Sequence, residues 1–428
     1  MARKVLLVTT VGWASTARYA GGFAAASWSV EAISPPGAPV VRSRYVDACH
    51  SYRPLFAPSS LNKAIAKSRP DLVVACDDRA VTHLLRLYRR ELARHGEESP
   101  VVSLIRRSFG APQNFASMIS RSASMEIARR IGIRAPETIA VASETELDSC
   151  LSRIGLPAVL KVDGSWGGDG VIVARSRDEA LDAFRHLIHP ASRLRNFARA
   201  LRRRDAHYLL SALSPPPQHI SVQKFVCGRS AASAFACWQG EVVGALYYDV
   251  LVAEGMIGPP NVIRRVDCPQ MAQASRLVAK QFGLSGIFGL DFIRDDAGDV
   301  HMIEINPRTT QGGVLPFGEG RDLPSALANC VTRCETGRRE AIANDVVVFF
   351  PREWQRDPAS PYLSAGHHDV PWDDPAVLKS CLDSLTHGQP ARKRTTTETL
   401  APMTAQRPPD GHPKAIWRRA WAGGLVRS

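Results

Sequence analysis

The chain has 428 residues, an apolar fraction of 45% and a formal net charge of +13. Its length accommodates two or three domains, and no run approaches the roughly 18 apolar residues that a membrane helix needs. Its nine cysteines form no CxxC pair, which argues against a disulfide scaffold and indicates reduced thiols. Composition therefore favours a cytoplasmic globular protein that spans no membrane.

The positive charge is concentrated in one stretch. Between Arg185 and Asp205 there are seven arginines, opposed only by Asp205. A basic segment of this kind can meet nucleic acid or an anionic substrate, but a solvated helix face is the favoured interpretation. No nucleic-acid-binding motif accompanies it, so nucleic acid is not the expected partner.

Residues 1–111 alternate strand-like and helix-like stretches, from KVLLVTTVG to DLVVACDD and AVTHLLRLYRRELARHG. This alternation predicts βαβ units around a parallel sheet. The basic, apolar N-terminus also fits a signal peptide, but its β-branched residues and following glycine favour a first strand. TTVGWAS has too few glycines for a dinucleotide fingerprint. Asp77 and Asp78 follow a predicted strand, where they either line a substrate pocket or cap the next helix.

The pattern of predicted helices and strands changes after about residue 112. A helix is predicted over 114–131, and LPAVLKVDGSWGGDGVIVA then indicates a strand, a glycine loop and a second strand. Lys161 lies within the first of these strands, where a lysine is costly unless its ammonium meets an anion. The loop Gly164–Gly170 contains four glycines, so its backbone N–H groups are able to fold over a polyphosphate. A hairpin with a flexible tip is the alternative.

The run GIFGLDFIRDDAGDVHMIEINPR predicts two short strands joined by a turn that contains Asp and Gly. With the turn centred between Ala297 and Gly298, antiparallel pairing places Asp291 opposite Glu304, with Asn306 on the same face as Glu304. Two facing carboxylates repel each other, whereas a Mg²⁺ ion, which takes oxygen ligands, stabilises them. The alternative is an ordinary hairpin with exposed acids, which the apolar surroundings disfavour.

The last part of the chain is harder to interpret. Residues 341–385 form a C-terminal extension with one clear strand, DVVVFFP, and residues 386–428 are predicted to be disordered. Within that tail, Trp417 and Trp421 are four residues apart and indicate a short docking helix. Its target is not readable from the sequence.

Taken in order, Lys161, the glycine loop, QKFV and IEINPR resemble the ATP-grasp superfamily, of the carboxylate–amine ligase type. The region around Lys161 is also similar to biotin carboxylase and the large chain of carbamoyl-phosphate synthase. The resemblance implies an ATP-grasp fold, in which two α+β subdomains clasp ATP. That domain would occupy residues 112–340, with a lid at about 137–227, and a Rossmann-like parallel α/β domain at 1–111 would precede it.

The resemblance also implies roles for individual residues. Lys161 would contact the α- and β-phosphates of ATP, and Arg308 would stabilise the transferred phosphoryl group, which makes these two the expected catalytic residues. Asp291, Glu304 and Asn306 would hold two Mg²⁺ ions, with Mn²⁺ as an alternative metal. The nucleotide contacts expected besides Lys161 are Arg121, Gly164, Gly167, Gly168, Gly170, Gln223, Lys224, Phe225 and Val226.

Three positions depart from the family pattern. Arg121 stands where the family commonly has lysine, although a guanidinium also pairs with phosphate. Gln223 replaces a hinge acid that is often Glu. Arg229 and Ser230 follow the hinge glycine, where an acid often binds ribose.

The activity implied is that of an ADP-forming ligase. A substrate carboxylate attacks the γ-phosphate of ATP to give an acylphosphate, and an amine or thiol then displaces phosphate. Two alternatives stay open: a carboxyphosphate-forming enzyme, and a nucleotide-binding regulator without turnover, suggested by Arg121 and Ser230. The expected partners are a small carboxylate and an amine, with homo-oligomer formation left open.

Overall fold

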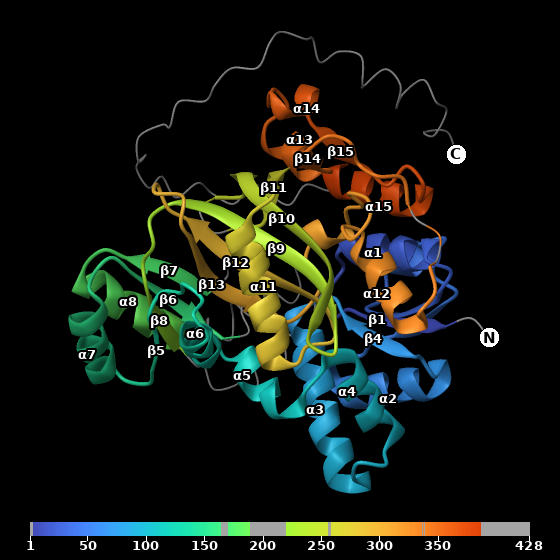
Figure 1. Cartoon of the computed structure of the whole chain (residues 1–428), viewed down its shortest axis with the longest axis horizontal. Helices are drawn as coiled ribbons and strands as arrows, with labels where there is room; N and C mark the ends of the chain where they lie inside the picture. The colour runs from blue at the N-terminus through green and yellow to red at the C-terminus, as the bar shows by residue number, and fades with distance from the viewer. Residues whose placement is uncertain are drawn as a thin grey trace.

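The computed structural model describes residues 3–163, 170–188, 220–255, 258–335, 337 and 339–386. The arginine-rich stretch after residue 188 and the tail at 387–428, with Trp417 and Trp421, lie outside these residues. Three sheets organise the described chain (Figure 1). None of the described helices is long and apolar enough to cross a bilayer.

The N-terminal domain contains a four-stranded sheet of order β3-β2-β1-β4, in which all pairs are parallel. This confirms the predicted parallel α/β domain. Four of the five residues of the central strand β1 and all four of the edge strand β4 are buried, because helices cover both faces of a parallel sheet. The elements are β1 (Lys4–Val8), α1 (Ala14–Ala25), β2 (Ser29–Ser34), η1 (Pro39–Arg42), β3 (Ala48–Ser51), η2 (Pro54–Phe56), α2 (Ala57–Ser68), β4 (Leu72–Ala75), α3 (Asp78–His95) and α4 (Pro100–Phe109).

The connection to the next domain departs from the prediction of one helix over 114–131. After η3 (Pro112–Asn114), the structure has α5 (Phe115–Ile119) and α6 (Arg121–Arg130), separated at Ser120. Ser120 leaves the helical conformation, and its side chain accepts a hydrogen bond from the N–H of Ala123. Serine is a favoured N-cap, so the break makes Arg121 the first residue of a new helix.

A second four-stranded sheet, called the lid sheet here, has the order β5-β8-β6-β7 and is antiparallel. Its helices pack on one face, over a core that includes Ala158, Leu160 and Val162 of β6. Because side chains alternate along a strand, Lys161 points to the opposite face. The elements are β5 (Thr138–Val141), α7 (Glu144–Ile154), β6 (Ala158–Val162), β7 (Val171–Ala174), α8 (Arg177–Ile188) and β8 (Ile220–Lys224).

The third sheet has seven strands in the order β13-β12-β9-β10-β11-β14-β15. Helices α11 and α12 cover opposite faces of it, and strands from residues 341–385 complete it. The elements are β9 (Arg229–Trp238), β10 (Glu241–Ala253), β11 (Pro260–Arg265), α11 (Pro269–Phe282), β12 (Gly286–Arg294), β13 (Val300–Asn306), η4 (Gly312–Val314), α12 (Leu323–Thr332), β14 (Val346–Phe349), α13 (Arg352–Arg356), α14 (Tyr362–Ala365), β15 (His367–Asp369) and α15 (Pro375–Thr386).

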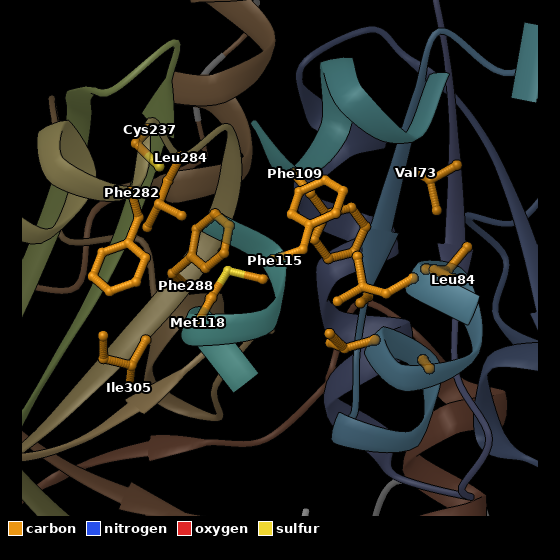
Figure 2. Close-up of a cluster of buried hydrophobic side chains, with 14 of the residues drawn as sticks. Val73, Leu84, Phe109, Phe115, Met118, Cys237, Phe282, Leu284, Phe288 and Ile305 are labelled. Atoms are coloured by element: carbon orange, nitrogen blue, oxygen red, sulfur yellow. The ribbon is translucent and has the colours of Figure 1, made fainter. Parts of the chain in front are cut away.

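One apolar cluster joins the N-terminal domain to the seven-stranded sheet. Figure 2 shows Phe109, Phe115 and Met118 between the two, with Phe288 and Ile305 on the sheet side. All five side chains are at least nine-tenths buried. This shared core places the ends of the N-terminal strands against the chain that follows β13.

Two hydrogen bonds fix that contact. The N–H of Thr309 donates to the carbonyl of Ala75, at the end of β4, over 3.0 Å. The Tyr19 hydroxyl donates to the carbonyl of Thr310 over 2.8 Å. The carboxyl edge of the parallel sheet therefore faces the residues that follow the β12–β13 hairpin, where ligands of α/β domains commonly bind.

Candidate active site

The facing acids of the hairpin occupy the positions that the sequence predicts. Asp291 of β12 pairs directly with Glu304 of β13, which confirms the predicted register. Asn306 is buried, and its amide donates to Asp291 Oδ2 over 3.0 Å. Two carboxylates and one amide oxygen are thereby gathered on one face.

The turn of this hairpin differs slightly from the prediction. The ladder closes with Arg294 opposite Val300, so the turn is centred on Ala297 rather than between Ala297 and Gly298. An extra residue of β13, Ile303, forms a bulge that restores the predicted pairing beyond it. The bulge also points a main-chain carbonyl out of the ladder, where side chains of the lid sheet can reach it.

Two residues of the lid sheet use that carbonyl. Lys161 is only 4% exposed, and its ammonium donates to the Ile303 carbonyl over 3.4 Å. Gln223 of β8 donates to the same oxygen over 3.2 Å and to the Thr138 hydroxyl over 2.9 Å. The structure thus brings the strand lysine and the hinge glutamine together at the hairpin.

Arg121 lies on the same side of the site, but it meets an acid. Its Nη2 lies 2.7 Å from Oε1 of Glu304, and its Nη1 donates to the Val162 carbonyl. Burial lowers the pKa of Arg121, yet the adjacent Glu304 outweighs this and raises it. In this conformation Arg121 neutralises a candidate metal ligand.

Burial and mutual charge shift the ionisation of the central groups. Burial, reinforced by Glu304, raises the pKa of Asp291 to about 6. Burial lowers the pKa of Lys161 to about 8, against the opposing effect of Glu304. Burial also raises the pKa of Glu304, but Arg121 and Lys161 outweigh it and bring the value below the ordinary one.

Arg308 connects the hairpin to the N-terminal domain. Its Nη2 donates to Asn306 Oδ1 over 3.1 Å, and its Nε donates to Asp78 Oδ2 over 2.8 Å. The guanidinium carbon lies 5.9 Å from the centre of the Trp13 ring, within range of a cation–π contact. Burial raises the pKa of Asp78 even though Arg308 opposes the shift.

Of the two roles considered for Asp77 and Asp78, helix capping applies to Asp77 and a place at the candidate site applies to Asp78. Asp77 caps α3 by accepting from the N–H of Ala80, and it also accepts from the N–H of Thr10 over 2.6 Å. Asp78 instead reaches the site through Arg308. The sequence left Asp78 open and gave no role to Trp13, whose only sequence signal is its place directly after the first strand and its glycine.

The expected nucleotide contacts are only partly described. Gly164, Gly167 and Gly168 lie outside the described residues, while Gly170 adopts a φ of +80° and accepts from the N–H of Val162 over 3.0 Å. A residue other than glycine is strained in that conformation. The described base of the loop therefore has the tight turn that a glycine permits.

The hinge after β8 is described in full. The N–H of Lys224 donates to the Glu137 carbonyl over 2.9 Å, and that of Phe225 donates to the Pro157 carbonyl over 3.4 Å. Within the described part of the chain, the N–H of Val226 makes no hydrogen bond. An adenine edge has a main-chain donor available at Val226.

The side chains present fit a magnesium nucleotide. Mg²⁺ is usually held by one or two carboxylates, with waters and substrate phosphates completing its shell. Asp291 and Glu304 are two such carboxylates, and the described residues contain no larger cluster of His, Cys, Asp and Glu able to hold a metal. The buried ammonium of Lys161, whose hydrogen bond to the Ile303 carbonyl is long, fits a phosphate.

Comparison with known proteins identifies the class. A family model described as an ATP-grasp domain matches residues 215–312. The carbamoyl phosphate synthase large chain of Hyperthermus butylicus is 24% identical over 327 residues, which is 73% of this chain. The match spans only 28% of that relative's length.

Solved structures agree on the fold. The carboxyaminoimidazole ribonucleotide synthase of Aspergillus clavatus, complexed with ATP, has a TM-score of 0.54 at 17% identity and covers 77% of each chain. The biotin carboxylase domain of the Hydrogenobacter thermophilus 2-oxoglutarate carboxylase, solved with MgADP and bicarbonate, has a TM-score of 0.52 at 14% identity and covers 80% of this chain and 71% of its own. The solved structures show that the chain has an ATP-grasp fold, and the family model places an ATP-grasp domain over residues 215–312.

Proposed function

We propose that the chain is an ATP- and Mg²⁺-dependent ligase that activates a small carboxylate as an acylphosphate for attack by an amine or thiol, with release of ADP and phosphate. The observation that carries the proposal is the joining of Asp291, Glu304, Lys161 and Arg308 at one hairpin between the lid sheet and the N-terminal domain. Facing acids and buried cations at one point offset the charges of a phosphoryl transfer.

Each group has a role that follows from its position. Asp291, Glu304 and Asn306 would hold the metal, which supplies a positive charge that neutralises phosphate oxygens. Lys161 lies on the lid side of the hairpin and would bind phosphate. Arg308 lies on the opposite side, beside Asp78, and would stabilise the transferred group. The number of metal ions, two in our proposal, is open to titration.

The second substrate would bind on the N-terminal side of Arg308. There the side chains of Trp13 and Asp78 meet the guanidinium, at the carboxyl edge of the parallel sheet. Asp78 is able to accept a hydrogen bond from an amine, and the Trp13 ring offers an apolar surface. These two residues are the proposed determinants of the substrate that joins the activated carboxylate.

A carboxyphosphate-forming reaction is the second candidate. It is favoured by the similarity to a carbamoyl phosphate synthase large chain and to a carboxylase domain solved with bicarbonate. In that case bicarbonate replaces the organic carboxylate, and the same residues carry the reaction. A nucleotide-binding regulator without turnover is the third candidate. It is favoured by the ion pair between Arg121 and Glu304, which engages a carboxylate proposed to hold the metal.

The test is substrate-stimulated ADP release in the presence of Mg²⁺, measured with pools of amino acids, small carboxylates and bicarbonate. A ligase responds to an organic carboxylate with an amine, and a carboxyphosphate-forming enzyme responds to bicarbonate. Glu304→Gln should lower the stimulated rate at least about a hundredfold. Asp296→Asn, at the exposed turn of the same hairpin, is the matched control and should retain the rate.

If no pool stimulates ADP release while calorimetry detects binding of a Mg²⁺–ATP analogue, the regulator is correct and the ligase is not. If the analogue does not bind at millimolar concentration, both proposals fail.

A further inference from the structure

A cavity lies away from the candidate active site. It has a volume of about 420 Å³ and is lined by residues of α1, of the segment at 339–343 and of the segment at 367–374. None of its lining residues is among the candidate nucleotide, metal or substrate residues. Figure 1 shows the elements around it, α1 and α15, beside each other at the end of the molecule opposite the lid sheet.

The cations that line this cavity are already paired. Nη2 of Arg18 lies 2.6 Å from Oδ1 of Asp369. The guanidinium of Arg339 binds both carboxylate oxygens of Asp322, over 2.8 and 3.0 Å. Their charges are therefore largely neutralised within the protein.

Three further acids of the lining form no ion pair through their carboxylates within the described residues. Asp373 accepts from the Tyr45 hydroxyl over 2.9 Å, and Asp374 accepts from the Ser43 hydroxyl over 2.6 Å. Arg44 donates to the main-chain carbonyl of Asp373 over 3.3 Å, and Glu340 is exposed. Burial, reinforced by Asp373, raises the pKa of Tyr45, as expected for a negative surrounding. The cavity therefore favours a positively charged ligand.

Exposed apolar side chains lie on the elements around the cavity. Trp372, which precedes Asp373, is 63% exposed, and Val41 of η1 and Leu382 of α15 are 43% and 42% exposed. Helix α15 packs against η1, with Val377 buried between them and the core. Acids beside exposed aromatic and aliphatic side chains suit a peptide that combines basic and aromatic residues.

The chain itself contains such a peptide. Residues 387–428 include eight lysines and arginines against two acids, and they end in the run WRRAW at 417–421 followed by seven residues. The tail leaves the end of α15, whose twelve residues span about 18 Å from the cavity side. Thirty residues separate α15 from Trp417 in the sequence, and a flexible linker of that length reaches about 30 Å.

We propose that the acidic cavity and the exposed side chains of Val41, Trp372 and Leu382 form the docking site of this chain's own basic C-terminal segment at 414–421. Arg418 and Arg419 meet Glu340 and Asp373, and the two tryptophans cover the exposed apolar side chains. The short tether gives the segment an effective concentration in the millimolar range, so weak contacts suffice. The proposal is independent of the proposed ligase activity.

Proximity is tested on the full-length chain with a zero-length carbodiimide cross-linker. A mixture of isotopically light and heavy protein distinguishes contacts within one chain from contacts between two. We expect Lys414 to cross-link within one chain to Glu340 or Asp373, and the double variant Trp417→Ala, Trp421→Ala to reduce the yield at least fivefold. Cross-links only between chains, or an equal yield to acids across the surface, would overturn the proposal.

Protection of the segment is tested by limited trypsin digestion. We expect cleavage after Arg418 and Arg419 to be at least tenfold slower than after Arg392 and Arg394 of the same tail. The double variant Glu340→Lys, Asp373→Lys should remove that protection, while Glu98→Lys, Asp182→Lys, an equal charge change of +4 at remote exposed sites, should not. In the unaltered protein, 0.5 M salt should also remove it. Equal cleavage at both sites in low salt would refute docking, whatever the behaviour of the variants.

Discussion

The parallel sheet of the N-terminal domain and the β12–β13 hairpin differ in where their acidic residues lie. Strands β1 and β4 are apolar runs, and the acids Asp77 and Asp78 come directly after β4 ends. The hairpin carries Asp291 and Glu304 inside its strands, facing each other. Enclosing a charge in a sheet costs several kcal/mol unless it is neutralised. The difference indicates that the parallel sheet supplies stability, whereas the facing acids of the hairpin lower it, as we expect of groups whose proposed role is to bind a metal.

Replacing a hairpin acid is the sharpest test of this contrast. Asp291→Asn should lower stimulated ADP release at least about a hundredfold, because a proposed metal ligand is lost. The same change should raise the free energy of unfolding at pH 7 by about 2 kcal/mol, since a carboxyl with a pKa raised to about 6 is ionised there at a cost.

The raised pKa of Asp291 also predicts how the free energy of unfolding changes with pH. A raised pKa makes the folded state bind the proton more tightly, so wild type loses stability as pH rises through about 6. The stabilisation by Asp291→Asn should therefore shrink between pH 7 and pH 4, as measured by urea unfolding. A variant that is less stable than wild type at pH 7 would break the comparison.

The opposite result is expected in the parallel sheet. Leu6→Ala in β1 removes a fully buried side chain and should lower the free energy of unfolding by about 3 kcal/mol. ADP release per folded molecule should stay within twofold. Leu55→Ala, at a side chain that is 64% exposed, is the control and should change stability by less than about 0.5 kcal/mol.

The two regions meet at the ion pair between Asp78 and Arg308. Arg308→Lys keeps the charge but loses the fork that binds Asp78 and Asn306, so we expect stimulated turnover to fall about tenfold. Asp78→Asn should cost a similar factor. If the pair acts as a unit, the double variant will be only slightly worse than either single variant. Multiplying losses would show that the two residues act separately.

The smallest expected effect concerns Lys161. Its pKa of about 8 means that the ammonium is lost above that pH in the free protein. Calorimetry with a non-hydrolysable ATP analogue should show affinity falling severalfold between pH 7.5 and pH 9.5, with proton uptake on binding. Lys161→Arg keeps its charge over this range and should remove the slope. A slope unchanged in the variant would exclude Lys161 as its cause.

The features that the sequence predicts well are local or periodic. The parallel sheet follows from continuous apolar runs, and the opposition of Asp291 and Glu304 follows from the two-residue period of a hairpin. Each of these depends on neighbours within a few tens of residues.

The features that the sequence does not predict depend on distant contacts. Arg121 pairs with Glu304 across 183 residues, and Asp78 pairs with Arg308 across 230. No periodicity in the sequence encodes such partners. Arg121 pairs with Glu304 because Ser120 caps α6 and makes Arg121 its first residue. The arginine-rich stretch shows the same limit at its described edge, where Arg185 binds Glu144.

The bulge at Ile303 has a consequence for the contact between the lid sheet and the β12–β13 hairpin. Its carbonyl fastens the lid sheet through Lys161 and Gln223, and Lys161 is also the cation proposed to bind phosphate. Nucleotide and fastening therefore compete for a single ammonium group. Binding of a phosphate by Lys161 would therefore remove the hydrogen bond from Lys161 to Ile303, while the hydrogen bond from Gln223 remains. The nucleotide would weaken one of the two contacts between the lid sheet and the hairpin.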